Sequence, residues 1–467
     1  MTRCRWDVGL IDILPDDILL PIFDYCVDQN GYKKEEIEAW QTLVHVCRRW
    51  RGVVFGSPLR LNLRLVCATT TPARNTLDVW PALPLYIQSS SPPREDSADN
   101  VLVVLERSNR VYLINLLCFS SSDFEKFWAA MDMPFPELRH LQLGSNKKMM
   151  PVLPDSFLGG SAPLLRTFTL DGIPFPGLPK LLLSAPHLFS LYLLNIPHSG
   201  YFSPEAMVAA LSTLNRLRRL WLEFQSPRSR PDRYPPAPRR LVRPALIDFR
   251  FKGASEYLED LVARIVTPRL GKMEITVFNQ IIFDMPQFIQ FISCTPTLKA
   301  PEEAHVIFED GASRVNFSSP ASGFESFEVK IPCNDLDWQV SSLEQVFTSC
   351  LPHISTLEGL SIDSPGCWRR EWQDNVENTL WMELLLPFTG VKNLYLSKEF
   401  AQRIVPALQD LVEDTTEVLP ALENIFLEAG LEASGSVEKG IGQFVAMREV
   451  TRHPITVAPW DRSSSSD

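Results

Sequence analysis

One apolar pattern recurs through most of this 467-residue chain. It is a hexad whose first, fourth and sixth positions are apolar, and seven copies follow one another at intervals of 23 to 29 residues. These copies are Val111/Ile114/Leu116, Leu138/Leu141/Leu143, Leu165/Phe168/Leu170, Leu188/Leu191/Leu193, Leu217/Leu220/Leu222, Leu246/Phe249/Phe251 and Leu270/Met273/Ile275. Three later copies are Leu357/Leu360/Ile362, Val391/Leu394/Leu396 and Leu422/Ile425/Leu427. One hexad can arise by chance in a leucine-rich chain, but seven in succession favour a structural repeat.

Proline marks the start of many hexads, two residues before the first apolar position, where it ends a preceding helix and sets extended backbone. These prolines are Pro136, Pro163, Pro186, Pro244, Pro268 and Pro420. Between hexads, segments 203–214, 255–266 and 400–413 show helical spacing of apolar residues. A strand with a helical return in each unit is typical of leucine-rich repeats, whose units stack because one unit cannot bury its own apolar edge. The sequence therefore predicts an α/β fold, with parallel strands and return helices in a solenoid.

The predicted solenoid is irregular. Between residues 276 and 356 the hexad is lost, although Phe324, Phe327 and Val329 suggest strands there. The run Pro301-Glu302-Glu303 interrupts a further copy. We therefore expect a departure from the regular repeat in this region.

The segments on either side of the array have their own patterns. Residues 59–67 alternate between leucine or cysteine and other residues, which predicts a strand with one buried face. Residues 440–460 predict a closing helix and a short strand that cap the array. The chain is thus divided into an N-terminal module at 1–56, a linking strand and loops at 57–110, the solenoid at 111–435, and a cap with a disordered tail at 436–467.

Composition limits the compartment and the class of partner. The chain has 45 basic and 56 acidic side chains, a net charge of −11, which argues against general binding to nucleic acid or to an anionic membrane. Nine scattered cysteines without a CxxC pair indicate reduced thiols rather than a disulfide framework or zinc site. No apolar run approaches the roughly 18 residues of a membrane span. We expect an intracellular protein of the cytoplasm or nucleus that needs no cofactor.

The sequence contains no motif of a known catalytic site. It lacks GxSxG, a phosphate-binding GxxxxGK[ST] loop, HExxH and GxGxxG, and its seven histidines are isolated from one another. We therefore expect a protein that is not an enzyme.

A basic segment interrupts the array. Residues 216–243 contain nine arginines and no lysine, with several prolines among them. We favour a disordered insertion between two repeats. The alternative is a contact for an acidic or phosphorylated partner, because guanidinium groups pair bidentately with such groups. Its candidate residues are Arg239, Arg240 and Arg243.

The N-terminal module carries a recognisable arrangement of residues. The run Leu14-Pro15-Asp16-Asp17-Ile18-Leu19 is followed by Ile22-Phe23, and then by Leu43-Val44-His45-Val46-Cys47-Arg48-Arg49-Trp50. Together these runs resemble an F-box. The remainder is similar to the leucine-rich F-box proteins abundant in mushroom-forming fungi, at Thr76-Leu77-Asp78-Val79-Trp80-Pro81, Pro134-Phe135-Pro136-Glu137-Leu138 and Arg452-His453-Pro454-Ile455.

This resemblance implies a three-helix module that docks on the Skp-type adaptor of a cullin-based (SCF-type) ubiquitin ligase, while the solenoid binds a target protein. The positions that match the adaptor-facing pattern are Leu14, Pro15, Ile18, Leu19, Ile22, Phe23, Val46, Cys47 and Trp50. Pro21 departs from the pattern, and we expect a kink or a restarted helix there. The alternative is a leucine-rich-repeat interaction scaffold in which the N-terminal helices only cap the solenoid.

Overall fold

The computed structural model forms two compact units, Met1–Leu165 and Arg166–Asp467. It describes residues 14–28, 39–58, 60–68, 73–89, 97–145, 147, 150–227, 240–243, 245–278, 283–298, 301–318, 326–351, 354–364, 376–410, 418–428, 435–450 and 453–460. None of the helices in this described part is both long enough and apolar enough to cross a membrane.

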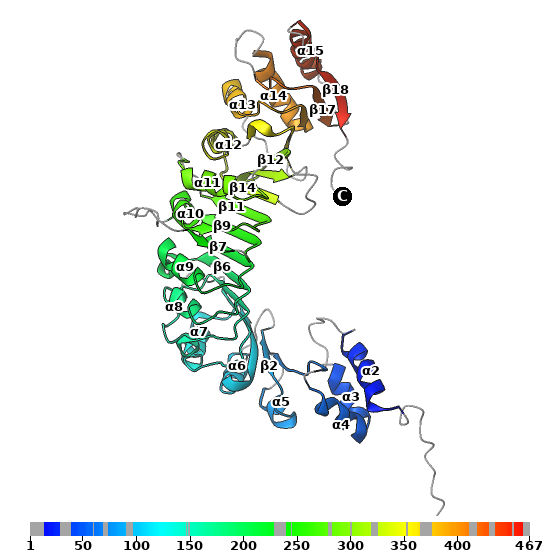
Figure 1. Ribbon diagram of the computed structural model, residues 1–467, viewed down its shortest axis with the longest axis vertical. Helices are drawn as coiled ribbons and strands as arrows, with labels where there is room; N and C mark the ends of the chain where they lie inside the picture. The colour runs from blue at the N-terminus through cyan, green and yellow to red at the C-terminus, as the bar shows by residue number, and fades with distance from the viewer. Residues whose placement is uncertain are drawn as a thin grey trace, which may run out of the picture. The chain divides into compact units, whose positions relative to one another are not determined.

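The first unit begins with α2 (Asp16–Asp28), α3 (Ala39–Val46) and α4 (Arg48–Gly56), which pack on one another (Figure 1). Leu19 and Phe23 lie one turn apart on α2 and are fully buried, as an amphipathic helix requires. Helix α2 runs through Pro21 without interruption. The restarted helix expected from the sequence is therefore not observed.

A parallel sheet follows in the first unit, with strand order β1-β2-β3-β4. Its elements are β1 (Leu65–Ala68), α5 (Ala73–Val79), β2 (Leu85–Gln88), α6 (Ser97–Leu105), η1 (Ser108–Arg110), β3 (Val111–Leu117), α7 (Ser121–Ala130), β4 (His140–Gly144) and η2 (Phe157–Gly160). The segment 57–110, predicted to link the module to the repeats, contributes two strands and two helices to this unit.

The strand predicted over residues 59–67 is shorter than expected. It begins only at Leu65, and Leu59 lies outside the described residues. Residues 60–62 form turns instead, and Asn62 has a φ of 47° in the left-handed region, which a strand does not accommodate. Leu61 and Leu63 are nevertheless buried, so alternation of buried side chains continues beyond the strand itself.

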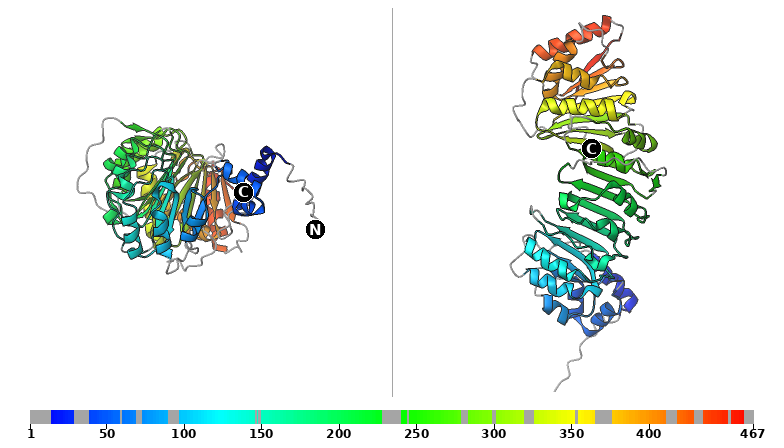
Figure 2. Two further views of the ribbon diagram at one scale, coloured as in Figure 1. Left: turned by 90° about the horizontal axis from the view of Figure 1, so that it is seen from below. Right: turned by 90° about the vertical axis from the view of Figure 1, so that its left-hand side faces the viewer.

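The second unit consists of strands and helices that alternate over most of its length. Its elements up to the middle of the unit are β5 (Thr167–Asp171), α8 (Leu178–Leu182), β6 (Ser190–Ile196), η3 (His198–Gly200), α9 (Pro204–Leu211), β7 (Arg219–Phe224), β8 (Leu241–Val242), β9 (Asp248–Gly253), α10 (Ser255–Val262), β10 (Ile265–Val266), β11 (Lys272–Val277) and α11 (Pro286–Cys294). Figure 1 shows β6, β7, β9 and β11 following one another along the unit, with α8 to α11 on one side of them, and Figure 2 shows the unit from two further directions.

The rest of the second unit begins with three consecutive strands and then returns to the alternation of helix and strand. Its elements are β12 (Glu303–Glu309), β13 (Ala312–Ser318), β14 (Ser326–Pro332), α12 (Leu336–Cys350), η4 (Ile354–Thr356), β15 (Gly359–Asp363), α13 (Asn378–Leu385), β16 (Asn393–Leu396), α14 (Lys398–Asp410), β17 (Asn424–Glu428), α15 (Gly435–Val450) and β18 (Thr456–Trp460). The strand order in this unit is β5-β6-β7-β9-β11-β14-β13-β12-β15-β16-β17-β18. Consecutive helices from α8 to α15 also pack on one another.

The hexads place equivalent apolar side chains in register on neighbouring strands. Phe168 pairs with Leu191, Leu191 with Leu220, Leu220 with Phe249 and Phe249 with Met273. All five side chains are fully buried. The predicted α/β repeat fold is thus confirmed, because each strand extends one continuous apolar row that no single unit could bury.

The predicted irregularity is a three-stranded insertion. Strands β12, β13 and β14 form an antiparallel meander, and its outer strands pair in parallel with β15 and β11. The first turn is Asp310-Gly311, with Gly311 at a φ of 87°, a dipeptide that favours two-residue hairpins. Phe327 and Val329 lie in β14 in register with the apolar row of β11, whereas Phe324 lies outside the described residues.

The chain ends in a helix and a strand, α15 and β18, where a closing helix and short strand were expected. Strand β18 pairs in parallel with β17. Residues 461–467, where the disordered tail was predicted, lie outside the described part of the chain.

Candidate functional site

Helix α2 carries apolar side chains on two adjoining faces, one buried and one exposed. Leu19 and Phe23 point into the helical bundle, and the ring of Phe23 lies 4.8 Å from that of Trp50 on α4. The adjoining face is a stripe at spacings of three and four residues that begins just before α2, and all its members are exposed: Pro15, Ile18 (50%), Ile22 (40%) and Tyr25 (68%). We call these four residues the docking stripe. Tyr25 was not among the predicted contact residues, although its position three residues after Ile22 places it on the same face.

An ion pair fixes the start of α2 on the bundle. The Nη2 and Nε atoms of Arg49 on α4 both donate to Oδ1 of Asp16, at 2.8 and 3.2 Å. Nη2 of Arg49 also donates to the backbone oxygen of Leu14, which is half-buried. These bonds hold the first turn of α2, and with it the beginning of the docking stripe, in a defined position.

The second half of the predicted adaptor face lies at the junction of α3 and α4. Val46 ends α3 and is 58% exposed. Cys47 caps α4, because its Sγ accepts a hydrogen bond from the backbone N–H of Trp50 at 3.4 Å. Cys47 and Trp50 are half-buried. Of the nine predicted adaptor residues, the structure thus exposes Pro15, Ile18, Ile22 and Val46, and it buries Leu19 and Phe23 completely.

Helix α3 joins the bundle to the sheet of the first unit. Trp40 is fully buried, and its Nε1 donates to the backbone oxygen of Arg64 at 3.1 Å, just before β1. The ring of Trp40 also lies 5.1 Å from that of Trp80, and His45 lies 5.8 Å from Trp80. These contacts are made by side chains of α3, and they do not cover the docking stripe on α2.

The three arginines of the predicted acidic-partner patch do not form one exposed basic surface in the described part of the chain. Arg239 lies outside the described residues. Arg240 donates to the side-chain oxygens of Gln287, at 3.1 Å, and of Gln290. Arg243 is only 8% exposed, and its Nη1 donates to Oδ1 of Asn215 at 2.9 Å. The guanidinium groups of both described arginines are therefore engaged within the chain.

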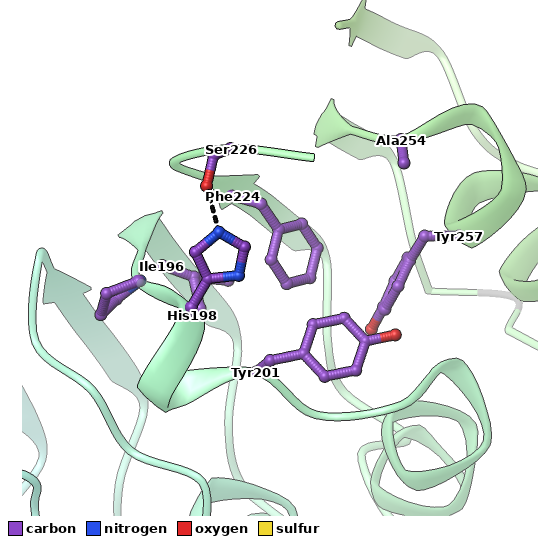
Figure 3. A pocket seen from close by; sticks show the side chains of 8 residues that line it. Ile196, His198, Tyr201, Phe224, Ser226, Ala254 and Tyr257 are labelled. Atoms are coloured by element: carbon purple, nitrogen blue, oxygen red, sulfur yellow. Dashed lines mark hydrogen bonds between the residues drawn. The ribbon is translucent and has the colours of Figure 1, made fainter. Parts of the chain in front are cut away.

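A small pocket follows the ends of β6, β7 and β9 (Figure 3). It is lined by Ile196, Pro197, His198, Tyr201, Phe224, Ser226, Ala254 and Tyr257. Nε2 of His198 and Oγ of Ser226 lie 2.6 Å apart across it. The two residues are one repeat apart in sequence, so no local motif contains both. In the described part of the chain, no group of three or more His, Cys, Asp and Glu side chains is placed to hold a metal ion.

Comparisons with known proteins add little. No protein-family model and no curated protein sequence matches the chain. Among solved structures, the leucine-rich repeat-containing protein LegL7 from Legionella pneumophila is similar over 82% of this chain and 97% of its own, with 11% identity and a TM-score of 0.28. The repeat fold of the present chain rests on its own strand register.

Proposed function

We propose that this protein is the substrate-receptor subunit of an SCF-type ubiquitin ligase. In this proposal α2, α3 and α4 dock on a Skp-type adaptor, and the repeat array binds a target protein. The observation that carries the proposal is the docking stripe, which is apolar and exposed along the helix whose Leu19 and Phe23 are fully buried in the bundle. A contiguous exposed apolar surface on a folded protein marks an interaction site.

The buried face of α2 supports the same proposal. Leu19 and Phe23 already supply the contacts that hold α2 on the bundle, so the docking stripe is not needed for the module to fold. In the proposed complex the receptor performs no chemistry. It raises the effective concentration of a target lysine near the charged ubiquitin-conjugating enzyme.

Co-purification with a Skp-type adaptor tests the proposal. We expect the wild-type protein to bind, and the double variant Ile18→Lys/Ile22→Lys to lose roughly tenfold or more in affinity, because two central apolar contacts become buried charges. The matched control is Val79→Lys on α5, at a site that is 72% exposed. A wild-type protein that fails to bind any Skp-type adaptor would refute the proposal, as would a double variant or a Leu14→Ala/Pro15→Ala variant that binds as well as wild type.

A repeat scaffold without a ligase is the second candidate. The contacts of Trp40 with Arg64 and Trp80 favour it, because they make α3 part of the packing at the start of the sheet. Deletion of residues 1–56 separates the two candidates. If the N-terminal helices only cap the array, the shortened protein should lose its cooperative melting transition. If the protein is a ligase receptor, the shortened protein should stay folded but no longer bind the adaptor.

A further inference from the structure

Three groups of aromatic side chains lie on the open face of the sheet, the face opposite the buried rows. Two of them are covered by arginines of this chain. In the first unit, the guanidinium carbon of Arg64 lies 5.1 Å from the ring centroid of Tyr86, and that of Arg139 lies 5.0 Å from that of Tyr112. In the second unit, Arg250 lies 3.8 Å from the ring of Trp221. Arginine side chains of this chain thus lie over aromatic rings on the open face of the sheet, an arrangement that cation–π attraction stabilises.

The third group, Tyr395 on β16, Phe426 on β17 and Trp460 on β18, is here called the terminal platform. The rings of Tyr395 and Phe426 stack with centroids 4.6 Å apart and an interplanar angle of 10°. The ring of Trp460 lies 5.6 Å from that of Tyr395 at an angle of 65°. All three side chains are half-buried. Among the described residues, no arginine or lysine lies over these rings.

Charge is unevenly distributed along the second unit. Strands β9, β11, β13 and β14 carry Arg250, Lys252, Lys272, Arg314 and Lys330. Four of these five cations form ion pairs with Glu274 or Glu309. Strands β12 and β15 to β18 carry no lysine or arginine, but they carry Glu303, Glu309, Asp363 and Glu428. The strands of the terminal platform therefore carry one carboxylate, Glu428, and no lysine or arginine, and Glu303 lies on β12, two strands away from β16.

Two carboxylates lie near the platform, and they differ in their partners. Glu428, in register with Trp460, accepts a hydrogen bond from the backbone N–H of Lys398 at 2.9 Å, whereas Glu303 remains available. It is exposed and forms no ion pair with any described residue. Its strand, β12, pairs with β15, which in turn pairs with β16, the strand of Tyr395. Burial raises the pKa of Tyr395 above its usual value, and the charge of Glu303 raises it further. The carboxylate therefore acts electrostatically on the platform.

We propose that the terminal platform binds an arginine side chain of a protein partner, with Glu303 as its counter-ion. The guanidinium group lies over the half-buried rings, as Arg250 lies over Trp221, and the carboxylate pairs with it from the side. Arginine fits better than lysine, because its planar group stacks on aromatic faces and is more weakly hydrated. The identification of this partner as a ligase target rests on the proposed function, whereas the recognition of arginine does not.

Random dodecapeptides displayed on phage provide the test, with the full-length protein as bait. We expect arginine to be enriched among peptides selected by the wild-type protein. The best peptide, labelled with fluorescein, should lose roughly fivefold or more in affinity when its arginine is replaced by glutamine. Glu303→Gln and Trp460→Ala in the protein should each produce a similar loss.

Two substitutions of the same kind serve as controls. Glu383→Gln changes an exposed carboxylate on α13, and Trp338→Ala removes an indole that is 47% exposed on α12; neither should change the affinity. Selected peptides without arginine enrichment would overturn the proposal, and so would unchanged binding by Glu303→Gln, an exposed position at which the fold is not at risk. If the protein selects arginine peptides but fails to bind a Skp-type adaptor, the platform proposal stands and the proposed ligase role is rejected.

Discussion

At the scale of single residues, side chains of the same kind on one helix have opposite surroundings. Ile22 and Phe23 are adjacent in α2, and the sequence pattern assigned both to the adaptor-facing set. In the structure Phe23 is fully buried against Trp50, whereas Ile22 is 40% exposed. Phe23 holds the helix in place, and Ile22 is available to a partner.

This difference predicts separable effects on stability. Phe23→Ala should lower the free energy of unfolding of the first unit by about 3–5 kcal/mol, because it leaves a cavity in the bundle. Ile22→Ala should cost about 1 kcal/mol or less. Urea denaturation followed by tryptophan fluorescence measures both, since Trp50 lies beside Phe23. Equal destabilisation by the two variants would show that the two faces are not distinct.

At the scale of elements, helices pack closely only where small residues permit it. In α15, a Cβ atom added at Gly440 would lie 2.5 Å from Cγ1 of Val405 and 2.6 Å from Nε2 of Gln409, both on α14. A Cβ atom added at Gly442 would meet nothing within 4 Å. Gly440 is thus a contact position between the helices, and Gly442 is a solvent-facing one.

Two alanine substitutions in this helix should therefore have opposite signs. Gly442→Ala should raise the stability of the second unit by about 0.5–1 kcal/mol, because alanine favours the helix. Gly440→Ala should lower it by about 1–3 kcal/mol, because α14 must move to admit the methyl group. Thermal melting followed by circular dichroism distinguishes them. Stabilisation by both variants would mean that α14 moves to admit the methyl group at Gly440 without a loss of stability.

At the scale of the whole molecule, the sheet of the second unit places carboxylates close together on its open face. Burial raises the pKa of Glu223, which the charge of Lys252 partly opposes, and burial likewise raises the pKa of Glu328 against the effect of Arg314. A carboxyl group whose pKa is raised by folding favours the folded state when protonated. Its contribution is fully present below the unfolded pKa, about 4.3 for glutamate, and is lost as the pH rises through the raised value.

Glu223→Gln should consequently raise the melting temperature at pH 7 more than at pH 4, because the uncharged amide avoids the burial of a charge. Differential scanning fluorimetry at both pH values measures this difference. Glu125→Gln, at an exposed position of α7, controls for the loss of one negative charge. The same increase at both pH values would contradict the expected linkage.

Much of the fold was predictable because its apolar period is simple. Each hexad places two alternate residues on the buried side of a strand, and the repeated pattern brings equivalent residues of neighbouring strands into register. The meander of β12 to β14 was not predicted, although Asp310-Gly311 is a strong hairpin signal. The hexad does not indicate the meander, because β12, β13 and β14 lack the repeat and pair antiparallel to one another.

The candidate site was predictable only as a set of residues. The sequence by itself determined that α2 is apolar over most of its surface, since Leu19, Ile22 and Phe23 follow one another at helical spacing. Only the tertiary structure decided which face is covered, because that depends on where Trp50 and the other helices pack. The same holds for the terminal platform: Tyr395, Phe426 and Trp460 lie far apart in sequence and meet only because β16, β17 and β18 pair in parallel. Apolar periodicity is set by the sequence of one segment, whereas the exposure of its side chains is set by the elements that pack against it.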